Sequence, residues 1–289
     1  SVTVLDTVVD LNGNILIEDT SAPEIVDTVN PGITEISSSF ADIENDDVVS
    51  DSDSTVTYTV SFSEPIAGMV DGDIAVSGGT LDADSVVVAE GGMSATFSVT
   101  ATQESVADLT VTINNTVVDV HGNALVPETS DAEAVDTVNP TATISDDQDG
   151  FAYDGANTVG YTVSFSEPIN NMVEEDITVS GGTLVSGSVL VANDGMSAEF
   201  DVLVNDDSLD NVEVTVGSTV VDLAGNTLIE VSDNLQSVDT INPLVTEIVS
   251  SFDDIEGNGV VSDSDAVVSY TVSFSEPIGG MVDGDIAVS

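Results

Sequence analysis

Acidic and amide side chains recur in matched groups along this chain, and their oxygens are the ligands that calcium prefers in proteins. Each group joins an Asp-Thr-Val/Ile-Asn-Pro segment, acids that follow a Phe-Ser sequence and, in the first two groups, an Asp-x-x-Gly-Asn sequence. The first group contains Asp27, Asn30, Glu64, Asp71, Asp73, Asp119 and Asn123. The second contains Asp136, Asn139, Glu167, Asp176, Asp222 and Asn226, and the third contains Asp239, Asn242, Glu276 and Asp285.

The charge balance strengthens the case for bound metal. The 289 residues include 54 aspartates and glutamates but no lysine or arginine, so the formal net charge is −54 at pH 7. Two carboxylates about 4 Å apart repel by about 4 kcal/mol at an effective dielectric constant of about 20. Monovalent salt screens charges only beyond about 8 Å at physiological strength. We therefore expect several Ca²⁺ ions, each with about six to eight oxygen ligands, to occupy the acidic groups.

Despite its acidity the chain has the composition of a folded protein, with 41% hydrophobic residues. Val56, Tyr58, Val60 and Phe62 alternate with threonine and serine, and the same pattern returns from Val159. This period of two indicates strands with one buried face. About seven short strands in roughly 100 residues predict an all-β chain of immunoglobulin-like sandwiches, without the cysteines and tryptophan found in antibody domains.

Internal similarity predicts that these sandwiches form a linear tandem array. The phenylalanine of Ser-Phe-Ser-Glu-Pro-Ile recurs at Phe62, Phe165 and Phe274, so two repeat lengths alternate. We predict a truncated C-terminal part of a repeat at 1–28, a long repeat at 29–137, a short repeat at 138–240 and a truncated N-terminal part at 241–289. The truncated parts indicate either a section of a longer tandem protein or domains that neighbouring chains complete in a fibre.

The usual strand order of a sandwich would bring the acids of each group together. The leading linker and the B–C and F–G turns then lie at one pole, where an ion would clamp successive repeats. A second acidic set lies in the A–B loop at the opposite pole, and in the short repeat it includes Asp147 and Asp149. Its alternating acids before a glycine resemble a calcium turn, although a solvated loop that blocks edge pairing is an equal alternative.

Several other functions fit the sequence poorly. Nucleic acid would be repelled by a surface without cationic side chains, and no apolar run is long enough for a membrane span. Catalysis has little support, because the only histidine, His121, is replaced by Asn12 and Ala224 at equivalent positions and fits a variable turn residue better than a base. Calcium-dependent glycan binding is the main alternative, but the few aromatic residues mostly fall on predicted core faces.

The motifs together resemble the bacterial immunoglobulin-like repeats of giant calcium-dependent secreted adhesins. The resemblance rests on Val-Asp-Thr-Val-Asn-Pro, on Phe-Ser-Glu-Pro-Ile, on the segments Asp73 to Leu81 and Asp176 to Leu184, and on Val118 to Asn123 and Val221 to Asn226. It implies a calcium-stiffened stalk at the cell surface, exported by type I secretion. Its partners would be neighbouring repeats of the same chain, or other copies if the chain is a filament subunit.

Overall fold

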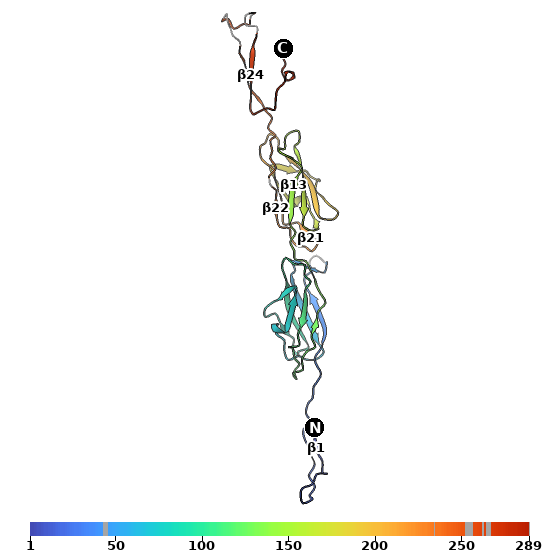
Figure 1. Cartoon of the computed structure of the whole chain (residues 1–289). Coiled ribbons are helices and arrows are strands. Elements are labelled where there is room, and N and C mark those ends of the chain that lie inside the picture. Colours follow the sequence, from blue (N-terminus) through green and yellow to red (C-terminus); the bar gives the residue numbers. More distant parts are fainter. Residues whose placement is uncertain (43–45, 234, 252–256, 262, 264–266, 289) are drawn as a thin grey trace. The chain divides into compact units, whose positions relative to one another are not determined.

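Two units make up the chain (Figure 1). The first contains residues 1–140 and 221–227, and the second contains residues 141–220 and 228–289. The computed structural model describes all residues except 43–45, 234, 252–256, 262, 264–266 and 289. Within this described part the helices are single 3₁₀ turns, namely η1 (Asp71–Asp73), η2 (Glu174–Asp176) and η4 (Asp283–Asp285). The remaining regular structure is strand, so the prediction of an all-β chain is confirmed.

The first unit holds two facing sheets. Its strands are β1 (Thr3–Val4), β2 (Asp19–Thr20), β3 (Ile33–Ser39), β4 (Val48–Val49), β5 (Thr55–Phe62), β6 (Ile74–Ser77), β7 (Gly79–Leu81), β8 (Val87–Val88), β9 (Ser94–Ala101), β10 (Thr110–Ile113), β11 (Glu128–Thr129), β12 (Ala134–Val135) and β21 (Val221–Asp222). One sheet has the order β3-β5-β9-β7, with β8 also paired to β9, and the other has the order β11-β10-β6. Strands β4 and β12 form a short parallel pair, and β1 pairs with β2.

Alternation along β5 and β9 builds the core of the first unit. Val56, Tyr58 and Val60 are fully buried, whereas the threonines between them are exposed or partly exposed. Tyr58 stacks on Phe97 of β9 with ring centroids 5.6 Å apart. Residues of β10 in the second sheet complete the same apolar cluster. The period of two in the sequence thus places one face of each strand inside a sandwich.

The second unit repeats this design. Its strands are β13 (Ala142–Asp146), β14 (Thr158–Phe165), β15 (Ile169–Asn171), β16 (Ile177–Ser180), β17 (Gly182–Leu184), β18 (Leu190–Val191), β19 (Ser197–Val204), β20 (Glu213–Val216), β22 (Val231–Ser232), β23 (Val245–Ser251) and β24 (Ser269–Phe274). One sheet has the order β13-β14-β19-β17, with β18 also on β19, and the other has the order β16-β20-β22. Tyr161 stacks on Phe200 with ring centroids 5.6 Å apart, as Tyr58 does on Phe97.

The segments outside these sandwiches are single hairpins. Within the described residues, strand β1 pairs with β2, and β23 pairs with β24. Their apolar side chains remain exposed, for example Val2 at 71% and Tyr270 at 66%, because a two-stranded sheet has no second layer to cover it. Among the described residues no helix has the length and apolar character needed to cross a bilayer.

We expect the stacked core pair to carry much of the stability of the first unit. Phe97→Ala should lower its free energy of unfolding by about 3–5 kcal/mol, because the lost ring leaves a cavity in a close-packed core. Thr96→Ala is the matched control, since the neighbouring side chain lies on the outer face and should cost less than about 1 kcal/mol. Urea unfolding followed by circular dichroism measures both, and equal costs would contradict the assigned strand faces.

Candidate metal centre

A tight turn built on Asp-x-x-Gly-Asn recurs three times, at residues 10–14, 119–123 and 222–226. In each turn the first aspartate accepts a hydrogen bond from the backbone N–H of the asparagine and another from its Nδ2. The glycine has a positive φ in all three turns, between 88° and 93°. Residues with a Cβ rarely adopt this backbone conformation. The glycine therefore allows the asparagine to fold back on the aspartate.

The aspartate of the second turn is buried and strongly hydrogen-bonded. Asp119 is 1% exposed, and its carboxylate accepts from the N–H of His121 at 2.8 Å, from the N–H of Asn123 at 2.9 Å and from Asn123 Nδ2 at 2.8 Å. Burial raises the pKa of Asp119, but the hydrogen bonds from Asn123 and His121 outweigh it and hold that pKa below its usual value. A carboxylate has about four lone-pair sites, and because the backbone N–H of Gly122 also lowers this pKa, the donors of the turn take up most of them.

The leading linker of the first repeat contacts this turn. Asp27, Asp119 and His121 each offer a ligand atom, and these atoms all lie within 4.8 Å of one another. His121 Nδ1 is 2.9 Å from Asp27 Oδ2, and Asn123 Nδ2 donates to the carbonyl of Asp27 at 3.5 Å. We call Asp27, Asp119 and His121 the Asp27 centre. Residues more than 90 positions apart in the chain therefore meet at one point.

The third turn makes the equivalent contact with the linker residue Asp136. Asn226 is 1% exposed, and its Nδ2 donates to the carbonyl of Asp136 at 2.9 Å and to Asp222 Oδ2 at 2.9 Å. Its Oδ1 accepts from the N–H of Asp51 at 2.9 Å. Carboxylate oxygens of Asp136 and Asp222 lie within 4.8 Å of each other. We call Asp136, Asp222 and Asn226 the Asp136 centre, and all three belong to the first unit.

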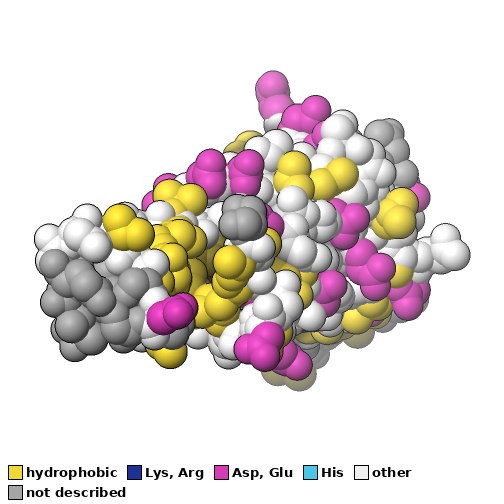
Figure 2. Space-filling model, turned by 90° about the horizontal axis from the view of Figure 1, so that it is seen from above, with side chains coloured by type: hydrophobic (Ala, Val, Ile, Leu, Met, Phe, Trp, Pro, Cys, Tyr) yellow, Lys and Arg dark blue, Asp and Glu magenta, His cyan; other side chains and the backbone are white. Residues whose placement is uncertain are grey.

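The charges at the Asp136 centre are not compensated by cationic side chains. Burial raises the pKa of Asp136, the negative charge of Asp222 raises it further, and the hydrogen bond from the N–H of Val138 only partly offsets both. Burial also raises the pKa of Asp51. The negative charges of Glu104 and Asp222 raise this pKa further, whereas a hydrogen bond from Gln103 lowers it. Asp and Glu side chains are spread among apolar ones on the face shown in Figure 2. A cation at this centre would relieve repulsion that the protein itself leaves in place.

Buried oxygens without a hydrogen-bond partner are also suitable ligands for a metal ion. Among the described residues, Glu64 Oε1 and Glu276 Oε1 are two such atoms, and they occupy the same position in different repeats. Asn139 Oδ1 and Asp51 Oδ1 are two more. A buried acceptor without a donor is costly unless a cation or water contacts it. The residues present are thus a set of oxygen donors of the kind that calcium requires.

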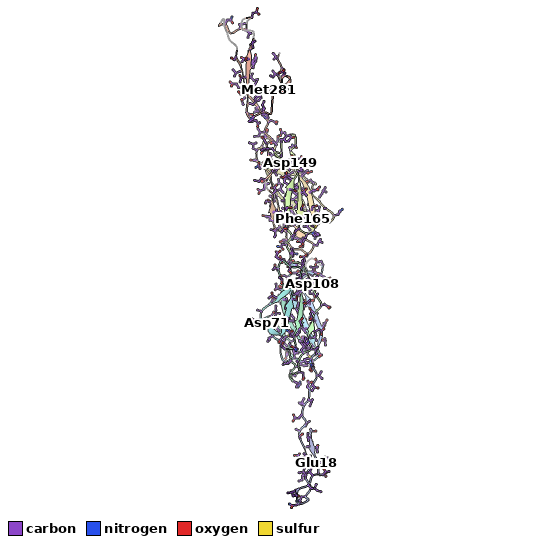
Figure 3. The ribbon with its side chains drawn as sticks, viewed as in Figure 1. Glu18, Asp71, Asp108, Asp149, Phe165 and Met281 are labelled. Atoms are coloured by element: carbon purple, nitrogen blue, oxygen red, sulfur yellow. The ribbon has the colours of Figure 1, made fainter. Side chains whose placement is uncertain are left out.

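Four of the predicted ligands make local hydrogen bonds. Asp71 and Asp73 lie in η1, where Asp71 Oδ2 accepts from the N–H of Asp84 at 3.2 Å and Asp73 Oδ2 accepts from the N–H of Val70 at 2.8 Å. Figure 3 marks Asp71 on the first unit. Asp176 and Asp285 bond the N–H groups of Val173 and Val282 in the same way. In the described part of the chain these four acids join no group of three possible ligands.

The other predicted ligands are placed as follows. Asn30 is exposed on the leading linker, and Glu167 lies in the second unit just after β14. Asp239 Oδ1 accepts from the N–H of Ile241 at 3.3 Å, and Asn242 Nδ2 donates to Asp154 Oδ2 at 2.6 Å. The prediction that these residues bind metal remains a prediction.

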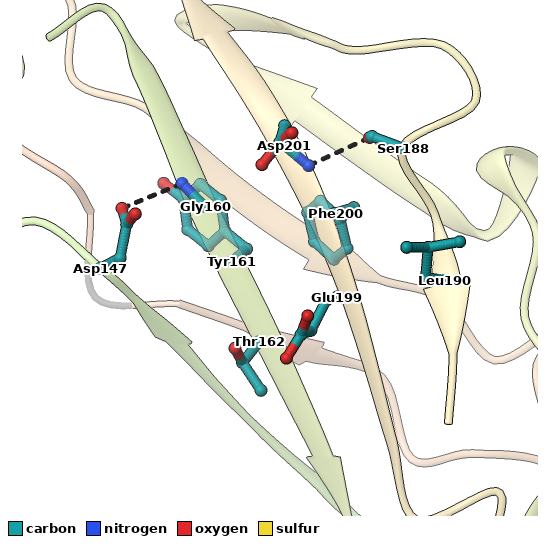
Figure 4. A pocket seen from close by; sticks show the side chains of 9 residues that line it. All are labelled: Asp147, Gly160, Tyr161, Thr162, Ser188, Leu190, Glu199, Phe200 and Asp201. Carbon is teal, nitrogen blue, oxygen red and sulfur yellow. Dashed lines mark hydrogen bonds between the residues drawn. The ribbon is translucent and has the colours of Figure 1, made fainter. Parts of the chain in front are cut away.

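The A–B loop acids Asp147 and Asp149 belong to the second unit. Asp147 Oδ1 accepts from the N–H of Gly160 at 3.0 Å, and Asp149 is exposed on the second unit (Figure 3). Asp147 lines an open cavity of about 340 Å³ on the outer face of β14 and β19, together with Glu199 and Asp201 (Figure 4). A Cβ on residue 160 would lie 3.1 Å from Asp147 Oδ2, so the glycine leaves room for the Asp147 carboxylate to accept the Gly160 N–H.

Two contacts at these centres are not expected from the sequence. The imidazole of His121, a variable turn residue, contacts Asp27. The backbone N–H of Asp51, in the loop before β5, donates to the Asn226 side chain. The turn at Asp10 has the same hydrogen bonds as the other two turns, and the Asp-x-x-Gly-Asn motif at residues 10–14 is the sequence feature that indicates it.

Comparison with known proteins identifies the type of domain. A family model described as "Bacterial Ig-like domain" matches residues 27–135 and again residues 136–238. This match, with the two-sheet units, confirms the prediction of tandem immunoglobulin-like sandwiches. No curated protein matches the chain.

Solved structures that match include the N-terminal part of the bacterial S-layer protein SbsC, at 16% identity and a TM-score of 0.25 over 73% of this chain and 45% of that one. The Yersinia pseudotuberculosis adhesin InvE matches at 17% identity and a TM-score of 0.22, over 71% of this chain and 61% of that one. Titin A168–A169 matches at 12% identity and a TM-score of 0.21, over 65% of this chain and 91% of that one. The chain spans less than half the length of the S-layer structure.

We expect Asn226 to hold its turn against the linker. Asn226→Ala removes its bonds to Asp136, Asp222 and Asp51 and leaves the Asp51 N–H without an acceptor, a loss of about 1–3 kcal/mol. Hydrogen exchange at the Asp51 amide should accelerate by about tenfold or more. Asn205→Ala, at an exposed position of the second unit, should leave that exchange rate unchanged. Equal rates in the two variants would show that the Asn226 contacts are dispensable.

The raised pKa of Asp136 predicts an unusual pH response in calcium-free solution. Ionised Asp136 opposes folding, so Asp136→Asn should stabilise the first unit at pH 7. As the pH falls through the raised folded pKa, wild type takes up the proton and gains stability, so the advantage of the variant should shrink. The lowered pKa of Asp119 reduces the free energy of unfolding at lower pH, but it does so equally in the wild type and the variant. Urea unfolding at pH 7, 5 and 4 measures the difference in free energy of unfolding between the variant and the wild type. A difference that grows on acidification contradicts the prediction.

Proposed function

Because the chain belongs to the bacterial Ig-like domain family, we propose that it is a calcium-stiffened structural segment of a bacterial surface protein. Its repeats would act as spacers outside the cell, without catalytic activity, in a stalk or adhesin. The observation that carries the proposal is the recurring Asp-x-x-Gly-Asn turn bonded to a linker aspartate, seen at both Asp27 and Asp136. A contact repeated in each module fits a periodic mechanical role better than a single catalytic or binding event.

Calcium would be held by Asp136 and Asp222 at the Asp136 centre, and a metal ion would occupy the equivalent place beside Asp27 and Asp119. The buried Oε1 of Glu64 is a further oxygen donor in the first unit. When bound, the ion would supply the positive charge that no side chain provides. The chain's own contribution is to orient the ligands, because three hydrogen bonds fix the carboxylate of Asp119 before any ion arrives.

The expected gain in stability is large enough to matter. Extracellular calcium modules have dissociation constants of about 0.1–1 mM. At about 10 mM calcium, a site with a dissociation constant of about 0.1 mM contributes about 2.7 kcal/mol to the folded state. A linker held to its turn in this way is ordered by the ion, so the array would be stiff where calcium is plentiful and more flexible where it is scarce.

Glycan binding is a second candidate, and one structural observation favours it. Phe151 and Tyr153 are 64% and 55% exposed in the loop before β14, although aromatic residues were expected mainly in the core. Between them, fully buried Ala152 pairs with Val238, which anchors the loop. Two exposed aromatic side chains on an anchored loop could stack on sugar rings. A glycan array with wild type and Phe151→Ala separates the two functions, because a spacer should bind nothing.

We expect calcium to raise the thermal stability of the first unit. In 10 mM calcium its midpoint should rise by about 10–20 °C relative to the chelated protein, given about 2.7 kcal/mol of binding and about 4–8 °C per kcal/mol for a domain of this size. Asp136→Asn should lose much of this shift, whereas Asp108→Asn, at an exposed position, should keep it. Calorimetry measures the midpoints.

The stiffening itself needs a second measurement. X-ray scattering should show a smaller radius of gyration after chelation, because linkers freed from their turns allow the array to bend. An identical midpoint and an identical scattering profile with and without calcium would rule out the proposed role of the ion.

A further inference from the structure

We propose that the Asp27 centre is a zinc site, distinct in metal preference from the other acidic centres of the chain. The proposal deepens the proposed function, since it rests on the same linker and turn, but it assigns a different ion to this one position. It starts from a nitrogen donor among the carboxylates. His121 is the only histidine in the sequence, and its Nδ1 lies 2.9 Å from Asp27 Oδ2.

The donor set has the size and chemistry that zinc requires. Zinc in proteins takes about four ligands, among which imidazole nitrogen and carboxylate oxygen are common, with bonds of about 2.0–2.2 Å. In a tetrahedral site with such bonds the ligand atoms lie about 3.3–3.6 Å apart. The ligand atoms of Asp27, Asp119 and His121 lie within 4.8 Å of one another, so the side chains would have to move by about 1 Å to close around the ion.

A second observation comes from another loop. Glu64 Oε1 is buried and has no hydrogen-bond partner among the described residues. Glu64 lies two residues before Ile66, whose backbone pairs with that of Asp119, so Glu64 belongs to a loop that adjoins the same turn. Asp27, Asp119 and His121 supply one nitrogen and two oxygens, so a water molecule or a movement of Glu64 toward the turn would complete four ligands. A buried acceptor that lacks a donor is accounted for if a cation sits beside it.

The other turns of the chain provide an internal comparison. The position of His121 is occupied by Asn12 in the turn at Asp10 and by Ala224 in the turn at Asp222. Calcium takes oxygen ligands, whereas imidazole suits zinc and its neighbours in the transition series. Of the three turns, only the one at Asp119 offers a ring nitrogen. The first linker would thus be held by zinc even when calcium is too dilute to fill the oxygen-only centres.

The single histidine makes a direct test possible, because its imidazole NMR signals report on this centre alone. The full chain, with histidine labelled by ¹⁵N, is titrated with zinc chloride at pH 7 in the presence of 5 mM calcium. We expect the His121 signals to shift and to saturate near one equivalent of zinc. Asp27→Asn should weaken zinc binding at His121 by about tenfold or more, while Asp136→Asn should leave it unchanged.

A second variant checks stoichiometry. His121→Asn, which copies the residue at position 12, should retain one zinc ion fewer than wild type on equilibrium dialysis in the same calcium buffer. His121 signals that do not respond to zinc, or equal zinc affinities for wild type and Asp27→Asn, would overturn the proposal. Calcium binding at the Asp136 centre is measured separately by calorimetry, so failure of the zinc site and failure of the calcium-stiffened spacer give different results.

Discussion

The structure depends on a buried carboxylate that is held by hydrogen bonds instead of by a cationic side chain. Asp119 and Asp222 are 1% and 2% exposed, in a chain that contains no lysine or arginine. Burying an unpaired charge is costly, and here the donors of the Asp-x-x-Gly-Asn turn meet that cost in part. Because these donors are backbone and amide groups, they satisfy the carboxylate without neutralising it. The turn therefore presents a fixed negative charge to whatever lies beside it.

The asparagine that completes the turn also joins it to the preceding linker. Asn226 Nδ2 bonds the carbonyl of Asp136 at 2.9 Å, and Asn123 Nδ2 makes the equivalent contact with Asp27 at a longer 3.5 Å. One side chain thus links the local conformation of the turn to the position of the linker. In the proposed function, this coupling is what lets a bound ion act on the arrangement of successive repeats, because the ion binds at the place where turn and linker already meet.

The fold was largely predictable, whereas the membership of the centres was predictable only in part. Alternation from Val56 to Phe62 specifies a strand with one buried face, since side chains of a strand point to opposite sides. Strand order in a sandwich was enough to anticipate that Asp27 and Asp119 lie near each other. Spacing could not show that Asp73, Asp176 and Asp285 each bond a nearby backbone N–H in a 3₁₀ turn, because that depends on local backbone conformation. Likewise, the contact of His121 with Asp27 depends on a side-chain direction that sequence does not encode.

The absence of lysine and arginine from the sequence has a consequence for how such a chain could be regulated. A lysine beside Asp136 and Asp222 would neutralise one charge permanently and would contribute the same stability in every medium. A divalent ion contributes only to the extent that its concentration exceeds its dissociation constant. Protons compete for the same oxygens, and the raised pKa of Asp136 brings that competition to milder acidity. In the proposed function, therefore, the ions and the acidity outside the cell would determine how firmly each linker is held to its turn.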